Sequence, residues 1–171
     1  ILAAHLKKLQ GKSPIRIWCS AASTGEEPYS IAMTAVETFN SFNIPVTILA
    51  SDLDTNVLSV AANGVYTADR VDKLTPERLS RFFTRTGDNY TVKPELRRML
   101  SFQRINLLET NWPVRGPLDI LFCRNVMIYF DNPTQRRVLE RIHRVMSPGG
   151  LLFVGHAENF TESRDLFVLK G

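Results

Sequence analysis

Short apolar runs alternate along the chain with longer segments in which apolar residues recur every three or four positions. The first pattern is typical of buried strands and the second of amphipathic helices. The strand-like runs are residues 15–18, 46–50, 120–123 and 151–154, and the helical segments begin after Gly25, at Thr55 and after Asn132. This alternation predicts an α/β fold with a doubly wound, mostly parallel sheet and helices on both of its faces.

Three elements near the chain ends follow from the same patterns. Residues 1–10 predict a helix with three leucines on one face. Asn132 is predicted to be the N-cap of the last long helix, with Pro133 at its first position. Residues 166–169 predict the start of a closing strand.

Residues 67–103 differ in character and predict a small antiparallel β-subdomain inserted into the larger domain of residues 1–171. Thr75 and Pro76 provide the cap and first position of a short helix. Residues 83–86 and 90–92 then flank Gly-Asp-Asn, which is favourable hairpin chemistry.

The first predicted strand ends in small residues, Ser20 to Ser23, and Gly25 permits a tight turn into the following helix. Small side chains allow a ligand to approach the backbone, as in dinucleotide-binding turns. Here, however, Glu26 and Glu27 follow at once. Two carboxylates favour a cationic or hydroxyl-bearing ligand and would repel a pyrophosphate, so the turn argues against a dinucleotide.

Polar residues also follow two other predicted strands. Asp52, one βα unit after the first turn, stands where such folds bind ribose hydroxyls; the alternative is that it or Asp54 only caps the next helix. Arg124 emerges after a continuously apolar strand, where ligands bind in open α/β sheets. Tyr129 is close enough to face the same site. The structural alternatives are an ion pair for Arg124 and a core position for Tyr129.

Composition indicates one soluble cytoplasmic domain. The chain has 171 residues, 44% of them hydrophobic, and no apolar run approaches the length of a membrane span. Both cysteines fall in predicted buried strands, and the three histidines are scattered, so no metal site is expected. Basic residues gather in and near the insertion, which is compatible with an acidic protein partner or with a solvated face. Nucleic acid is not expected, because no aromatic stacking motif accompanies them.

Five ordered blocks resemble the chemoreceptor glutamate methyltransferases of the CheR type. The blocks are residues 21–30, 50–54, 105–108, 122–131 and 155–160. The resemblance implies a Rossmann-like class I S-adenosylmethionine methyltransferase fold. It also implies methyl transfer to glutamate side chains of bacterial chemoreceptors, so that the receptor's cytoplasmic helices are the protein substrate.

The same resemblance implies which residues hold S-adenosyl-L-methionine and its product, S-adenosyl-L-homocysteine. The implied cofactor-binding residues are Ala21, Glu27, Asp52, Asn106, Leu107, Arg124 and Asn125. Of these, Asp52 would hold the ribose hydroxyls, and Asn106 and Leu107 would flank the adenine. Tyr129 and Arg124 are the implied catalytic residues, with Tyr129 beside the transferred methyl.

Full-length members of this family carry an upstream helical domain, so the chain is expected to be a fragment with an incomplete site and weak or no activity alone. In some members the β-subdomain binds the receptor's C-terminal peptide as an extra strand. The hairpin loop here looks shorter and poorer in glycine, which argues against such tethering. The alternatives are a non-catalytic module that binds cofactor or partner, and a methyltransferase acting on a small molecule or RNA.

Overall fold

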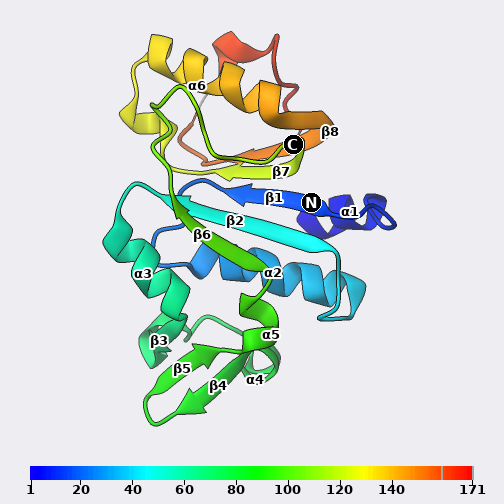
Figure 1. Ribbon diagram of the computed structural model, residues 1–171, viewed down its shortest axis with the longest axis vertical. Helices are drawn as coiled ribbons and strands as arrows, with labels where there is room; N and C mark the ends of the chain where they lie inside the picture. The colour runs from blue at the N-terminus through cyan, green and yellow to red at the C-terminus, as the bar shows by residue number, and fades with distance from the viewer. Residues whose placement is uncertain (159, 171) are drawn as a thin grey trace.

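The computed structural model describes residues 1–158 and 160–170, and its centre is a five-stranded parallel sheet (Figure 1). Each neighbouring pair of strands in this sheet runs parallel. The order across the sheet is β6 (Leu100–Arg104), β2 (Val46–Asp52), β1 (Ile15–Cys19), β7 (Leu118–Cys123) and β8 (Met146–Val154). The predicted parallel sheet is confirmed.

Helices cover both faces of the sheet, because its central strands are apolar on both sides. Ile17 of β1 packs into the core beneath α1 (Leu2–Lys8), α2 (Glu26–Phe39) and α3 (Thr55–Asn63), whereas Trp18 packs into the core beneath α6 (Asn132–Val145). Figure 1 shows α6 above the sheet and α2 on the other side. The doubly wound architecture is therefore confirmed.

Two of the main helices, α3 and α6, begin at side-chain caps, and one cap differs from the prediction. Asp54 accepts a hydrogen bond from the Asn56 backbone N–H and caps α3. The cap of α6 is Asp131, not Asn132, because the Asp131 backbone is extended and its carboxylate accepts from the Thr134 N–H at 2.9 Å. Hydrogen bonds from Thr134 lower the pKa of Asp131.

A second, antiparallel sheet lies beyond the main one, at the bottom of Figure 1. Its strand order is β3 (Val65–Thr67), β5 (Asn89–Val92) and β4 (Phe83–Thr86), and short helices flank it: η1 (Ala68–Arg70), α4 (Pro76–Phe82) and α5 (Pro94–Arg97). Thr75 caps α4 as predicted. The hairpin turn is two residues long, Gly87 and Asp88, and Asn89 belongs to β5. The subdomain limits of 67–103 stay a prediction.

Two expectations near the end of the chain are wrong. Residues 166–169 form no strand, since they pair with no other strand in the part of the chain that the structure describes, and a strand is stabilised only by pairing. The strand expected at 151–154 begins earlier, since β8 starts at Met146 and includes Pro148 to Gly150, and its register with β7 shifts between Leu118 and Ile120. The remaining short helices are η2 (Met127–Tyr129) and η3 (Thr161–Ser163).

None of the helices formed by the described residues has both the length and the apolar character needed to cross a membrane.

Replacing Lys12 with methionine is expected to lower the free energy of unfolding by about 1–2 kcal/mol. Lys12 pairs with Asp119, which is only 3% exposed at the start of β7 and also accepts from the Arg16 N–H at 2.9 Å. Without Lys12 this buried carboxylate keeps one donor and loses its cation. Guanidinium unfolding measures the change, and Lys7→Met on the exposed side of α1 is the control expected to leave stability nearly unchanged.

Candidate active site

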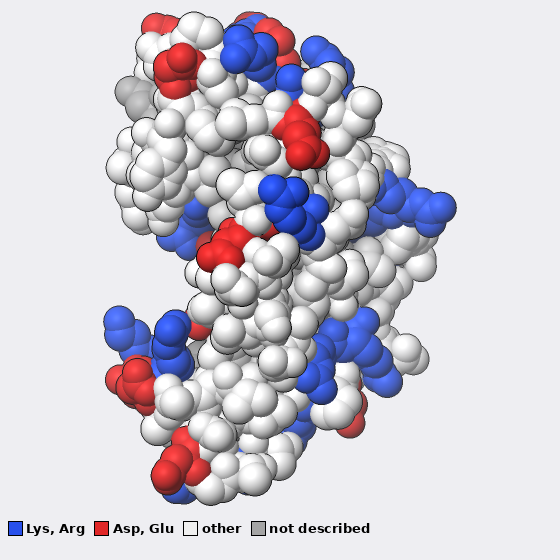
Figure 2. Space-filling view, turned by 60° about the vertical axis from the view of Figure 1, so that its left-hand side comes forward, with Lys and Arg blue, Asp and Glu red and all other residues white. Residues whose placement is uncertain are grey.

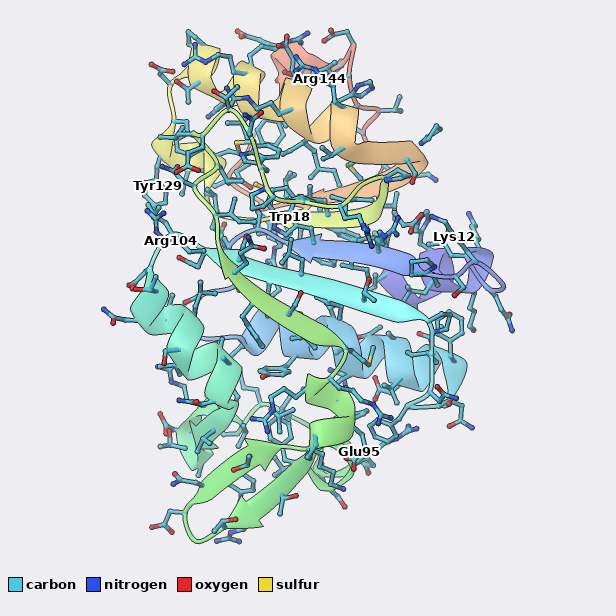
Figure 3. The ribbon with its side chains drawn as sticks, in the orientation of Figure 1. Lys12, Trp18, Glu95, Arg104, Tyr129 and Arg144 are labelled. Carbon is cyan, nitrogen blue, oxygen red and sulfur yellow. The ribbon has the colours of Figure 1, made fainter. Side chains whose placement is uncertain are left out.

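The residues singled out by the sequence lie at one edge of the main sheet, because parallel strands place their carboxyl ends together. The segments concerned follow β1, β2, β6 and β7. In Figure 3 Tyr129 and Arg104 mark this edge, and Lys12 lies at the opposite one. Figure 2 brings the same edge forward and shows the surface indented between the α6 side and the antiparallel sheet.

The turn after β1 is bound to both neighbouring strands. The Ser20 backbone N–H and hydroxyl both donate to the Phe122 carbonyl of β7, at 2.9 and 3.0 Å. On the other side the Ala22 N–H donates to the Ser51 carbonyl of β2 at 2.8 Å. Ser23 then adopts φ +49°, an uncommon conformation for a residue with a side chain. Ala21, one of the implied cofactor-binding residues, lies between Ser20 and Ala22 in this segment.

Asp52 joins the end of β2 to that turn. One carboxylate oxygen accepts from the Ser23 N–H at 2.9 Å and the other from the Asp54 N–H at 3.1 Å. The helix cap is Asp54, so the capping alternative applies to Asp54 and not to Asp52. Each carboxylate oxygen of Asp52 keeps a further lone pair that can accept from a ligand hydroxyl.

Glu27 and Arg124 connect the first turn to the end of β7. Their ion pair has an N–O distance of 2.9 Å, and the Cys19 thiol donates to the same carboxylate at 3.2 Å. Glu26 points elsewhere: it accepts from the Thr24 hydroxyl and pairs with Arg70 at 3.1 Å. The two adjacent carboxylates therefore have different partners, and only Glu27 is held by a residue of the candidate site.

Asn125 and Tyr129 lie on the loop after β7. Asn125 adopts φ +59°, and its side chain packs so closely on Gly155 that a Cβ there would collide with it. Tyr129 is 80% exposed, so it is not the core aromatic of the structural alternative. Arg124 does form an ion pair, with Glu27, as the structural alternative expected. Its side chain is still 43% exposed and therefore accessible to a ligand.

Glu158 fixes the loop that carries Asn125 and Tyr129, although no role was predicted for it. Its carboxylate accepts from the backbone N–H groups of Val126, Met127 and Gly155 at 3.1, 2.8 and 2.6 Å. It thus ties the end of β8 to the loop after β7. The available signal was its place in the last sequence block, residues 155–160, where a carboxylate stands between Ala157 and Phe160. Asn159 of that block lies outside the described residues.

The segment after β6 carries Asn106 and Leu107. The Asn106 side chain accepts from the Leu108 N–H at 3.0 Å and forms a local turn, while Leu107 is 6% exposed and belongs to the core beneath α6. Arg141 of α6 donates to the Glu109 carbonyl at 2.7 Å and so ties this segment to α6. Arg141 was assigned no role from the sequence, because only the fold brings it here.

Both cysteines are expected to react with a thiol reagent at least tenfold more slowly in the folded chain than in guanidinium. They are free and buried. Burial raises the pKa of Cys123 to about 12, and burial together with the neighbouring Glu27 carboxylate raises the pKa of Cys19 well above its ordinary value. The thiols therefore stay protonated near neutral pH. Rates measured at pH 8, followed by peptide mapping, would test this; equal folded and unfolded rates for either thiol would contradict it.

Comparison with known proteins places this geometry in context. The family model described as "CheR methyltransferase, SAM binding domain" matches residues 1–170. Chemotaxis protein methyltransferase 2 of Pseudomonas aeruginosa is 52% identical over 164 residues, which cover 94% of this chain and 59% of that protein. The chemotaxis protein methyltransferase of Escherichia coli is 45% identical over 175 residues, covering 100% and 60%. The chain thus spans about 60% of the length of these relatives.

Among solved structures, a TehB-like SAM-dependent methyltransferase from Corynebacterium glutamicum superposes with a TM-score of 0.51. The match covers 90% of this chain and 61% of that one at 12% identity, and such a likeness concerns the fold alone. With the family model and the observed sheet order, this likeness confirms the predicted fold class, the α/β fold of class I methyltransferases.

Proposed function

Because the chain belongs to the family of CheR methyltransferase SAM-binding domains, we propose that it takes part in methylating glutamate side chains of bacterial chemoreceptors. S-adenosyl-L-methionine is the methyl donor. The observation that carries the proposal is the connected set of contacts at the carboxyl ends of the strands, in which Asp52 is bonded to the turn after β1 and Arg124 to Glu27 at the start of α2. The chain spans about 60% of the length of its relatives, so the activity is proposed for the whole protein and not for this chain alone.

The polar groups at this edge fit the cofactor. Asp52 offers carboxylate oxygens that can accept hydrogen bonds from ribose hydroxyls. Glu27 neutralises Arg124 beside the turn, so that the guanidinium does not repel a cation there. Ala21 and Glu27 would lie along the methionine part, and Asn106 and Leu107 along the adenine. When bound, the cofactor supplies an electrophilic methyl group carried on a sulfonium.

The chain's own residues have a positioning task. A glutamate carboxylate, with a reference pKa of about 4.3, is ionised at neutral pH and needs no general base to attack the methyl carbon. The cofactor would supply the methyl group to a carboxylate oxygen of the receptor and would leave as the neutral thioether product, without any proton transfer by the chain. Arg124, Asn125 and the exposed Tyr129 would therefore align the reactants and exclude water from the carboxylate.

The cytoplasmic helices of a chemoreceptor are the substrate that we propose, and the cytoplasm is the compartment. Several basic residues of the insertion are occupied within the molecule: Arg78 pairs with Glu37 at 2.6 Å, and Arg97 donates to the Asn63 carbonyl at 2.8 Å. These residues therefore hold α4 to α2 and α5 to α3. The contacts give no support for peptide tethering, which we do not propose.

The test is the chemistry of the methylated product. The full-length protein that contains this chain would be incubated with methyl-labelled cofactor and a receptor cytoplasmic fragment. A carboxyl methyl ester releases volatile methanol in mild base, whereas N-methyl and ribose O-methyl groups do not. Base-labile label on the receptor, absent when the accepting glutamates are changed to glutamine, is the expected result. Base-stable label, or label on added RNA instead, would overturn the proposal.

A further inference from the structure

The turn after β1 also contacts the antiparallel sheet, through β3 and the short helix that follows it. The Tyr66 hydroxyl, on β3, donates to the Thr24 carbonyl at 2.7 Å across 42 positions of sequence. Arg70, just after β3, reaches the Thr24 hydroxyl at 3.4 Å and the Glu26 carboxylate at 3.1 Å. Together with the bond between Ser23 and Asp52, these contacts join the turn both to the main sheet and to the segment around β3.

The packing around the Tyr66 hydroxyl leaves the turn little freedom. A Cβ on Gly25, which has φ +101°, would stand 2.7 Å from the Tyr66 oxygen and 2.9 Å from the Ala61 Cβ. Only glycine fits in both conformation and space. The Tyr66 ring is 5% exposed and makes edge contacts with Tyr29 and with Phe83 of β4, at centroid distances of 6.3 and 6.4 Å. A displacement of Phe83 would therefore be felt at Tyr66.

We propose that Tyr66 is a positioning residue for the cofactor turn, and that it couples the antiparallel sheet to cofactor affinity. The Thr24–Gly25 peptide links Ser23, which is bonded to Asp52, with the helix start that carries Glu27. Fixing the Thr24 carbonyl thus fixes the spacing between the two carboxylates. The coupling is reciprocal: cofactor binding stabilises the contact of Tyr66 with the turn. This inference rests on the proposed function.

Tyr66→Phe tests the inference, because it removes the hydroxyl and keeps the ring. Tyr90→Phe is the matched control. Tyr90 is the cross-strand neighbour of Tyr66 in the same sheet, and its hydroxyl donates no hydrogen bond to any residue that the structure describes. Two quantities would be measured on this chain: amide hydrogen exchange of Ser23 and Gly25 without ligand, and the dissociation constant of S-adenosylhomocysteine by calorimetry.

Tyr66→Phe is expected to speed exchange at the turn several-fold and to weaken S-adenosylhomocysteine about fivefold, with exchange in β7 and α6 unchanged. Tyr90→Phe should alter neither quantity. If both variants behave like the parent chain at the turn and in affinity, the inference is wrong while the proposed function stands. Faster exchange throughout the chain would mean a general loss of stability and would also overturn it. If the parent chain itself binds no S-adenosylhomocysteine, the coupling is rejected, whereas the proposed function is decided separately by the methyl-ester assay on the full-length protein.

Discussion

Asp52→Ala is expected to weaken S-adenosylhomocysteine binding at least about a hundredfold. We propose that the carboxylate accepts hydrogen bonds from the ribose, and charge-assisted bonds of this kind contribute about 1.5–3 kcal/mol each. The substitution also frees the Ser23 N–H, which Asp52 holds at 2.9 Å, so the turn loses its link to β2. Titration calorimetry on the parent and variant chains measures the change directly.

Asp54→Ala supplies the matched control, since it removes a carboxylate two residues away that has a different task. Asp54 caps α3, and losing the cap should cost about 1 kcal/mol of stability without a change in affinity. Asp52→Asn keeps one acceptor oxygen and should fall between the parent and Asp52→Ala. Equal affinity of the Asp52→Ala chain and the parent would remove ribose binding from this residue and would reopen the assignment of the cofactor.

The order of strands and helices could be read from the sequence because it depends on local periodicity. Ile17 and Trp18 belong to one strand and face opposite cores, which is the condition for a sheet covered on both sides. The candidate site followed from a rule of topology: parallel strands bring Asp52 and Arg124 to one edge wherever they stand in the chain. Even the end of β2 at Asp52 agrees with the expected change from apolar to polar residues.

The contacts that hold the site together could not be predicted in this way. Tyr66, Arg141 and Glu158 each support a turn from an element at least 31 positions away, and local patterns contain no information about such partners. Asp131 and Asn132 are both good N-cap residues, so the sequence does not decide between them. The extended backbone of Asp131 makes it the cap. The expected strand at 166–169 was apolar enough, but strand pairing is a property of the whole sheet.

The separate partners of Glu26 and Glu27 lead to the second large effect. Glu27→Gln is expected to weaken S-adenosylmethionine binding about 30- to 100-fold. The loss of S-adenosylhomocysteine affinity is expected to be about ten times smaller. Glu27 neutralises Arg124 at 2.9 Å, so its loss leaves an uncompensated guanidinium beside the proposed place of the sulfonium. Only the methyl donor carries that positive charge, whereas the product's sulfur is neutral. Calorimetry with both ligands gives the ratio.

Glu26→Gln is the control, because the Glu26 carboxylate is already bound to Thr24 and Arg70 and faces the antiparallel sheet. It should leave the ratio of the two affinities unchanged.

Adding Arg124→Met to Glu27→Gln removes both charges of the pair and should restore much of the preference for the methyl donor, even if overall affinity stays low. Equal weakening of both ligands by Glu27→Gln would mean that the carboxylate contacts a group common to donor and product, such as the methionine ammonium. The charge of the sulfonium would then be balanced by something other than Glu27.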